Sequence, residues 1–409
     1  MKKTLLFLVI VFITLSCTEP YALQTDTFED ALVIEATLTN ELKKQEIKIS
    51  RTFVFEQTAP TIETGATVYI TDDLGNQYNF EEENGKYISE FEFEALPNRQ
   101  YQLFINTSNG KQYTSTREKL TTISPLTQIN ATKKTKFGVE GVEITANSYD
   151  PTGTSKYYRF EYEETYKIVS PNWTEKKLNL TYDSDTFIVT PTFTIKDYDS
   201  SICYNTEYSN ELLLINNSGT NDDRVLDFPV RFVPQENHIL AYRYSILVKQ
   251  YVQSLEAYTF YKTLKDFSGD GSVLSPNQPG FIEGNINNIA NKTEKVIGFF
   301  DVSSYSTKRI FFNYNDIFDG DPISKYHINC DDYKYEYSPS TLIENCEGTF
   351  APPPPHDHPY CEYGLYALYR NVEFLKGEIY YESTYKTTIP ICGECNRAFS
   401  NVVPEFWID

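Results

Sequence analysis

The segments Leu32-Val33-Ile34-Glu35-Ala36 and Glu46-Ile47-Lys48-Ile49-Ser50 decide the fold class of this chain. The second segment alternates apolar and polar residues, which predicts a half-buried strand, because successive side chains of a strand point to opposite faces of the sheet. A further strand is expected at residues 67–71. Asn84-Gly85 and Asn109-Gly110 predict hairpins with type I′ turns, because both residue types accept positive φ angles. The folded part of the chain therefore begins as short strands joined by tight turns.

A corner motif indicates how these strands are arranged. Leu96-Pro97 followed by Tyr101-Gln102-Leu103 is similar to the Leu-Pro…Tyr-x-Leu corner of immunoglobulin-like and fibronectin-type sandwiches. We therefore expect an immunoglobulin-like β-sandwich over residues 31–118.

The rest of the chain is also rich in strand patterns, so the predicted fold class is mainly β. A β-rich middle domain is expected over residues 119–252, in which residues 118–135 form a linker or a strand that crosses between domains. Strand candidates in this domain lie at residues 157–162, 187–189, 212–215 and 242–248. A mixed β region follows at residues 253–409, with strands at 296–300 and 309–312. It contains one short helix over residues 254–266, with Ser254 as its N-cap and Ala257, Tyr261 and Leu264 at helical spacing.

Composition limits the class of partner. The chain has 409 residues, which favours two or three domains, and its formal charge is −21. A chain this acidic repels phosphate backbones, so we expect no nucleic-acid binding. It would also be repelled by anionic lipids, so attachment to a membrane would need an anchor.

The N-terminal residues predict such an anchor. Lys2 and Lys3 precede an apolar run from Leu5 to Ile13, and Ser16 stands before Cys17. This pattern is typical of a bacterial lipoprotein signal, and the apolar run is too short to span a bilayer as a helix. We expect a signal peptide at residues 1–16, lipidation of Cys17, and a lipidated tether over residues 17–30. The alternative is an ordinary signal peptide with an incidental cysteine.

Six further cysteines predict a set of disulfides, because an even number in an exported chain is typical of one. They are Cys203, Cys330, Cys346, Cys361, Cys392 and Cys395. Five of them follow residue 329, so the C-terminal region is expected to be the cross-linked one. We expect Cys346 to join Cys361 and Cys330 to lie near the Cys392/Cys395 pair. The spacing of Cys392 and Cys395 also occurs in redox and zinc sites, which stay open as alternatives.

Other motifs give no positive case for catalysis or for a cofactor. His356 and His358 flank Asp357 on a proline-rich loop, but two ligands are too few for a metal site. Acidic pairs at residues 183–185, 197–199 and 319–321 do not fit a calcium-binding loop of the helix-flanked type. Gly-x-Ser-x-Gly and His-Glu-x-x-His are both missing from the sequence. We therefore predict no catalytic residue, no metal and no cofactor.

Four blocks of sequence carry a resemblance to a known family. They are Thr18-Glu19-Pro20-Tyr21 after Cys17, the block from Gln278 to Ile286, Gly298 to Ser303 with Lys308 to Phe311, and Cys392 to Cys395 with Pro404 to Trp407. In these blocks the chain resembles the domain-of-unknown-function 4249 family over essentially the whole mature sequence. The resemblance implies an outer-membrane lipoprotein of Bacteroidota, encoded beside TonB-dependent receptors. It implies an accessory role next to a transporter barrel and supplies no catalytic residues.

Three functional hypotheses follow. The first is a non-catalytic binding or accessory lipoprotein of a TonB-dependent outer-membrane receptor or another outer-membrane barrel. We expect it to face the cell exterior, and a periplasm-facing protein stays open as the alternative. The second is a structural or assembly subunit of an outer-membrane complex, and the third is a surface hydrolase. We expect the main partner contact after residue 265, where tyrosines supply amphipathic contact area. The candidates are Tyr333, Tyr335, Tyr337, Tyr360 and Tyr363.

Overall fold

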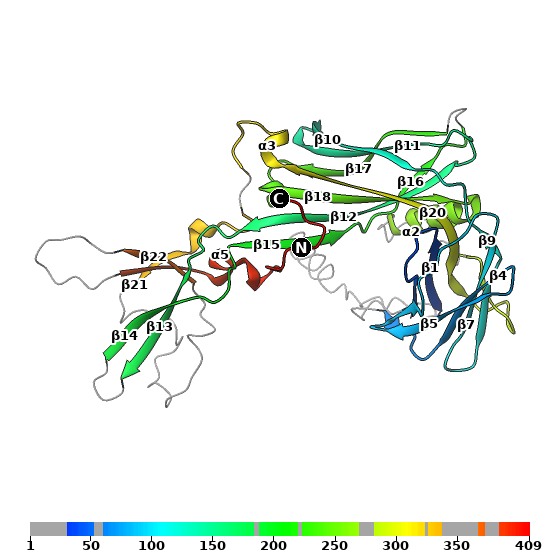
Figure 1. Cartoon of the computed structure of the whole chain (residues 1–409), viewed down its shortest axis with the longest axis horizontal. Coiled ribbons are helices and arrows are strands. Elements are labelled where there is room, and N and C mark those ends of the chain that lie inside the picture. Colours follow the sequence, from blue (N-terminus) through cyan, green and yellow to red (C-terminus); the bar gives the residue numbers. More distant parts are fainter. Residues whose placement is uncertain are drawn as a thin grey trace, which may run out of the picture.

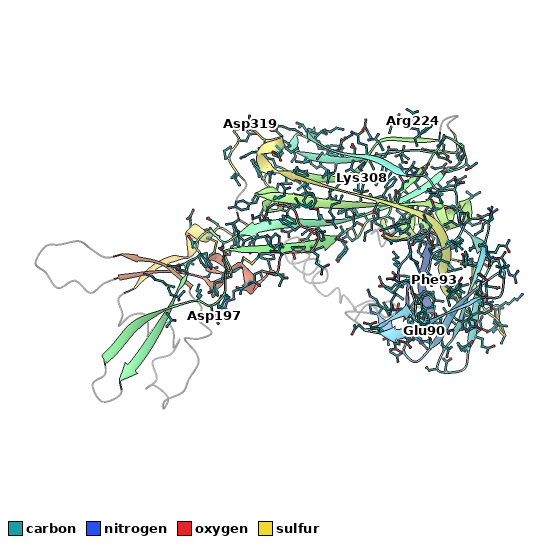
Figure 2. All side chains as sticks on the ribbon, viewed as in Figure 1. Glu90, Phe93, Asp197, Arg224, Lys308 and Asp319 are labelled. Atoms are coloured by element: carbon teal, nitrogen blue, oxygen red, sulfur yellow. A yellow bond between two sulfur atoms is a disulfide. The ribbon has the colours of Figure 1, made fainter. Side chains whose placement is uncertain are left out.

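The computed structural model describes residues 31–52, 60–183, 188–219, 223–269, 282–323, 326–337, 367–372 and 384–409. It is mainly β, which confirms the predicted fold class. Figure 1 shows a long sheet with an N-terminal unit at one end and an arm of β-hairpins at the other. Figure 2 shows that side chains fill the space between the layers of the body. Among the described residues, no helix is long and apolar enough to cross a membrane.

The N-terminal unit is built from short strands around one apolar core. Its strands are β1 (Leu32–Thr39), β2 (Glu46–Arg51), β3 (Thr61–Ile62), β4 (Thr67–Asp72), β5 (Gln77–Glu83), β6 (Lys86–Ser89), β7 (Gln100–Asn106), β8 (Gln112–Ser115) and β9 (Glu118–Lys119). The alternation seen in the sequence becomes an alternation of burial, because Ile47 and Ile49 of β2 are buried while Lys48 between them is exposed. The Tyr101 hydroxyl accepts a hydrogen bond from the Leu96 N–H at 2.8 Å, which is the local geometry expected of the corner motif. The immunoglobulin-like topology itself stays a prediction.

One of the two predicted hairpin turns has the predicted type. Asn84 and Gly85 join β5 to β6 with φ angles of 50° and 78°, as a type I′ turn requires. At Asn109-Gly110 the predicted hairpin forms between β7 and β8, but its turn is not type I′, because only Gly110 has a positive φ. Its N–H donates to the Thr107 carbonyl, and the Asn109 side chain accepts from the Lys111 N–H. Asn109 therefore caps a longer loop with its side chain.

The long sheet and a second layer enclose the larger core. The long sheet contains β12 (Tyr157–Val169), β15 (Ile202–Tyr208), β16 (Leu213–Asn216), β18 (Arg243–Gln253) and β20 (Val296–Asn313). The second layer is the three-stranded sheet of β10 (Leu126–Lys136), β11 (Val139–Tyr149) and β17 (Arg224–Pro234). Tyr158, Phe160 and Val248 from the long sheet meet Val142 and Ile144 from the second layer in one buried cluster. The segment at 118–135 is thus largely strand, which is one of the two alternatives left open by the sequence.

β20 joins the two halves of the molecule, which are the N-terminal unit and the two-layered body with β12, β15, β16 and β18. It pairs in parallel with β1 from Val296 to Ser303 and antiparallel with β18 from Ser304 to Asn313. The sequence predicted two separate strands here, and the structure forms a single strand of 18 residues. β19 (Ile286–Asn288) also pairs with β8 of the N-terminal unit. The predicted boundary between residues 252 and 253 therefore runs through one continuous sheet, because the C-terminal region completes the N-terminal unit.

The predicted helix forms as α2 (Leu255–Gly269), three residues longer than expected at its C-terminal end. The Ser254 hydroxyl accepts a hydrogen bond from the Ala257 N–H at 3.1 Å, which confirms Ser254 as the N-cap. Ala257 and Phe260 pack against Phe299 of β20. This small cluster holds the helix at the junction of the two halves.

The arm contains the remaining elements. They are β13 (Lys176–Asp183), β14 (Ile188–Ile195), β21 (Lys334–Tyr337), β22 (Ala367–Val372) and β23 (Thr384–Thr388). Short helical turns lie between or after the strands: η1 (His238–Leu240), α3 (Tyr314–Ile317), η2 (Cys330–Tyr333), α5 (Pro390–Gly393) and η4 (Cys395–Arg397). β13 pairs with β14, and β23 lies between β21 and β22.

Candidate functional site

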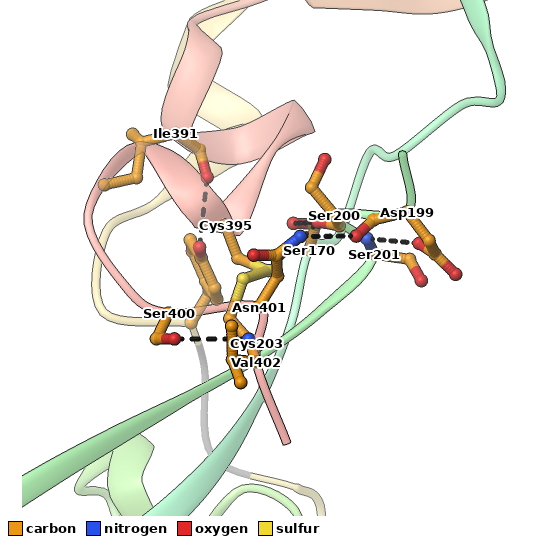
Figure 3. Close-up of a disulfide and its surroundings, with 11 residues drawn as sticks. Ser170, Asp199, Ser200, Ser201, Cys203, Ile391, Cys395, Ser400, Asn401 and Val402 are labelled. Carbon is orange, nitrogen blue, oxygen red and sulfur yellow. Dashed lines mark hydrogen bonds between the residues drawn. A yellow bond between two sulfur atoms is a disulfide. The ribbon is translucent and has the colours of Figure 1, made fainter. Parts of the chain in front are cut away.

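Two disulfides fix the C-terminal residues to the body and to the arm. Cys203 of β15 joins Cys395 (Figure 3), and Cys330 joins Cys392. Cys392 and Cys395 thus bind two different partners and not each other. Their thiols are consumed in separate structural bridges, which removes them as ligands of a metal and as a redox pair. Cys330 lies where the sequence predicted it, while Cys346 and Cys361 lie outside the described residues.

A buried carboxylate stands between these bridges. Glu394 is buried, and its oxygens lie 2.7 Å from the Lys196 ammonium and 2.8 Å from the Arg397 guanidinium. The Tyr198 hydroxyl donates to it at 3.1 Å. Burial alone raises the pKa of Glu394, but hydrogen bonds and charge from Lys196 and Arg397 outweigh burial and lower its pKa. Because every oxygen has a cationic or hydroxyl partner, we assign this group to holding β14 against the chain end.

Residues 400–409 form a segment that we call the C-terminal strap, which lies across the outer face of the long sheet. The Trp407 ring packs edge-on against Tyr204 of β15, with centroids 4.9 Å apart, and against Phe311 of β20. The Arg309 guanidinium lies 3.6 Å from the centroid of the Phe406 ring. Ser400 forms a β-bridge with Tyr204. The strap therefore covers part of a face that would otherwise expose aromatic side chains.

The same outer face carries a row of paired charges. Glu163 of β12 lies 3.0 Å from Arg309 and 3.7 Å from Lys249. Further along β12, Glu161 pairs with Arg159 and accepts a hydrogen bond from the Tyr251 hydroxyl. Since each charge has a partner, the row favours an ordered polar surface rather than a catalytic group held ready for reaction.

Arg159 also belongs to a buried network at the junction of the two halves. Its guanidinium lies between the rings of Tyr251 and Tyr261, at 4.1 and 4.7 Å from their centroids. Asp301 of β20 is buried nearby and accepts hydrogen bonds from Ser303 at 2.7 Å and Gln253 at 3.3 Å. Burial raises the pKa of Asp301, and Arg159 opposes that shift. The network links β12, β18, α2 and β20.

An open cleft of about 960 Å³ lies beside this junction. It is bounded by the first turns of α2, by residues 116–121 and by residues 282–287. Its lining includes the apolar side chains Leu120, Phe260, Ile282 and Phe299 and the polar side chains Arg117, Glu118, Lys119, Glu256, Glu283 and Asn285. Burial raises the pKa of Glu118, and the nearby charges of Asp301 and Glu256 raise it further. An apolar floor with a charged rim can hold an amphipathic ligand or a side chain of a partner.

The predicted contact residues are only partly described. Tyr333 ends η2, and Tyr335 and Tyr337 lie in β21, opposite Thr387 and Tyr385 of β23. Cys17 and the tether at 17–30, Tyr360, Tyr363, His356 and His358 lie outside the described residues. The sequence did not predict the cleft. Its lining comes from two parts of the chain, residues 100–121 and 254–299, which are more than 130 residues apart.

Two histidines that seemed unrelated in the sequence lie together. The rings of His238 and His327 have centroids 5.8 Å apart, and Tyr326 and Phe399 pack against His327. Burial lowers the pKa of both histidines. Within the described residues, no group of three or more His, Cys, Asp or Glu side chains could hold a metal ion.

The fold and these surfaces define a class: a mainly β protein with two halves joined by one long strand and with a disulfide-linked C-terminal end. A family model described as "Domain of unknown function (DUF4249)" matches residues 18–309, so the chain belongs to this family. The match confirms the resemblance but ends within β20. The expectation that family likeness covers the whole mature chain is thus supported only up to residue 309. No match was found among curated proteins.

Proposed function

We propose that this protein is a lipid-anchored lipoprotein of the outer membrane, facing the cell exterior. In this proposal it is a non-catalytic binding or accessory subunit of a TonB-dependent outer-membrane receptor. Membership of the family supports this assignment, because resemblance to that family implies the accessory role. The Lys2-Lys3 start, the apolar run and Cys17 support the anchor.

The disulfides support an exported location. Cys203–Cys395 and Cys330–Cys392 are bridges between distant segments, and such bridges persist in oxidising compartments. An extracytoplasmic location therefore agrees with both the N-terminal signal pattern and the disulfides of the C-terminal region.

The open cleft is the observation that carries the binding role. It combines an apolar floor with exposed charges of both signs, and it lies at the joint between the two halves. Arg117 and Lys119 are exposed on its rim. We assign this cleft to the contact with the receptor or with the ligand that the receptor imports.

The anchor is tested by Cys17→Ala. The variant should lose lipidation and leave the outer-membrane fraction, with the wild-type chain as the reference. Retention of Cys17→Ala in the outer membrane at the wild-type level would remove the anchor from the proposal. Protease treatment of intact cells tests the outward orientation, because an exterior protein is cleaved without lysis.

The partner is tested by a gentle-detergent pull-down of the lipidated chain, with identification by mass spectrometry. Co-purification of a TonB-dependent receptor is expected. Arg117→Glu with Lys119→Glu should reduce recovery of the receptor about tenfold, because charges at a rim guide association. Lys48→Glu is the matched control, since Lys48 is also exposed but lies outside the cleft. Equal recovery with both variants would exclude the cleft as the receptor contact.

A further inference from the structure

The tip of the β10–β11 hairpin displays an aromatic side chain in a conformation that aromatic residues rarely adopt. Lys136 pairs with Val139, so Phe137 and Gly138 form a two-residue turn with φ angles of 51° and 82°. Two positive φ angles define a type I′ turn, for which Asn-Gly is the preferred pair. Phe137 is fully exposed, at 106% of its reference accessibility.

Phe137 is therefore unfavourable in two ways, in its backbone conformation and in its exposure to solvent. A bulky side chain at positive φ is a backbone outlier. A fully exposed phenyl ring also gains nothing from burial. The chain itself contains the favourable alternative, because Asn84-Gly85 forms the same turn between β5 and β6 with φ angles of 50° and 78°. Backbone outliers of this kind are retained mostly where they serve a function.

The hairpin below the tip is rigid. β10 and β11 pair over their whole length, and β11 also pairs with β17. The Lys134 and Lys136 ammonium groups both bind Glu143, whose side chain is buried. Lys136 also lies over the Phe232 ring at 5.3 Å. Since the tip is held in place before any contact, binding would cost little conformational entropy.

The tip lies at the end of the long sheet that is remote from the N-terminal unit (Figure 1). Lys133, three residues before the turn, contacts Asp321 beyond α3 at 3.2 Å. Asp319, on the same loop, marks this end of the molecule in Figure 2. Phe137 is thus free to meet another molecule without hindrance from the arm or from the N-terminal unit.

The charges around the tip favour a protein over a lipid surface. Lys133 is paired with Glu140 and Asp321, while Lys134 and Lys136 share Glu143. The three lysines and three carboxylates sum to zero, with one positive charge in excess only at Lys134 and Lys136. One ring beside a cluster of zero net charge is too little to hold a chain of net charge −21 on an anionic bilayer. One exposed ring is sufficient for a protein pocket, where a single buried aromatic side chain commonly dominates the contact.

We propose that Phe137 is an anchor residue that inserts into an apolar pocket of a partner protein. The pocket carries a carboxylate at its rim, which faces Lys134 and Lys136. The inference adds a contact separate from the cleft. It rests on the proposed function only in that the chain works in a complex at the envelope, and the partner need not be the receptor.

The test uses the full lipidated chain with three variants. Phe137→Asn introduces the residue that the turn prefers, and Phe137→Leu keeps an apolar side chain. Asn84→Phe places the same ring at the matched turn of the N-terminal unit. Phe137→Asn should raise the folding equilibrium constant about fivefold, and Asn84→Phe should lower it by a similar factor. Denaturant titration of the purified chains measures both.

The binding arm of the test uses a photo-crosslinking phenylalanine analogue at position 137, with position 84 as the control. A discrete adduct to one other protein is expected at 137, with the attached peptide coming from an apolar pocket beside an acidic residue. Phe137→Asn should reduce the amount of the native complex about tenfold or more, while Phe137→Leu should retain most of it. The variant would then be more stable and less able to bind.

Several results would overturn the proposal. They are an adduct to lipid alone, an adduct to a second copy of this chain, no adduct at 137, or unchanged complex formation by Phe137→Asn. Its failure is distinguishable from failure of the proposed function, which is decided by the Cys17 variant and by whether a TonB-dependent receptor co-purifies.

Discussion

Asp150 is predicted to be a strong and pH-dependent source of stability. It lies in the turn between β11 and β12, and it is almost completely buried. One carboxylate oxygen accepts from the Thr152 N–H at 2.8 Å and from the Thr152 hydroxyl at 2.7 Å. The other oxygen accepts from the Thr154 N–H at 3.1 Å, the Ser155 N–H at 2.9 Å and the Ser155 hydroxyl at 2.8 Å.

Asp150→Asn keeps the shape of the side chain but replaces one acceptor oxygen with a donor. Whichever way the amide turns, at least two hydrogen bonds to a charged oxygen are lost. At about 1.5 kcal/mol for each, the variant should lose about 3 kcal/mol of unfolding free energy at neutral pH. Asp319→Asn is the control, because Asp319 is an exposed loop residue.

The pH dependence follows from the direction of the pKa shift. Burial raises the pKa of Asp150, but hydrogen bonds from Thr152 and Ser155 outweigh burial and lower its pKa well below the ordinary 3.8. Its stabilisation is therefore complete above the unfolded-state pKa and is lost as the pH falls below about 4. At pH 3 the difference between wild type and Asp150→Asn should have shrunk by about 1 kcal/mol.

Urea titrations between pH 7 and pH 3, followed by circular dichroism, measure this difference. The comparison between the two chains removes the contribution of the other carboxylates, which titrate in both. A difference that stays constant down to pH 3, or a loss at pH 7 no larger than that of Asp319→Asn, would refute the assignment of Asp150 as the ionised centre of the turn.

Two further predictions concern the C-terminal end. Removing one bridge with Cys203→Ala and Cys395→Ala should cost about 5 kcal/mol in the chain-entropy relation, since the bridge spans 192 residues. Denaturant titration measures the loss relative to the oxidised wild-type chain, and a loss below about 1 kcal/mol would contradict the prediction. Trp407→Ala should release the strap and increase hydrogen exchange in β15 and at residues 400–409, because the ring contacts Tyr204 and Phe311. Val402→Ala is the matched control, since Val402 lies on the same strap and is 71% exposed. Equal exchange in the two variants would show that Trp407 does not hold the strap.

Local patterns in the sequence predicted local structure. The alternation at residues 46–50, the Ser254 cap and the Asn84-Gly85 turn each depend on neighbouring residues, and each appears in the structure. The same reasoning failed at Asn109, where the side chain forms hydrogen bonds that compete with the type I′ geometry. Phe137 gave little signal as a turn residue, because only Gly138 beside it fits the turn preference.

Contacts between distant segments could not be derived in this way. β1 pairs with β20 across more than 250 residues, and no periodicity in either segment names its partner. The predicted domain boundaries were placed at changes along the chain, which carry no information on such pairings. The partner of Cys203 and the contact between His238 and His327 were hidden likewise. The cleft depends on the pairing of β1 with β20 and on the packing of α2 against Phe299, and neither contact has a local signal in the sequence.

Described residues from three of the four blocks that carry the family resemblance meet along β20, and this explains what those residues specify. Gly298 lies so close to β1 that a Cβ would stand 2.5 Å from the Ile34 carbonyl oxygen, and Gly284 approaches Gly298 even more closely. The Asn285 amide then binds the N–H and the carbonyl of Phe300, at 2.7 and 3.0 Å. Further along the strand, Arg309 stacks on Phe406 of the strap. These residues join segments that are far apart in the sequence. Family likeness in them therefore indicates a common joint between the two halves, whereas the identity of a ligand or partner must be sought in the cleft and at the hairpin tip.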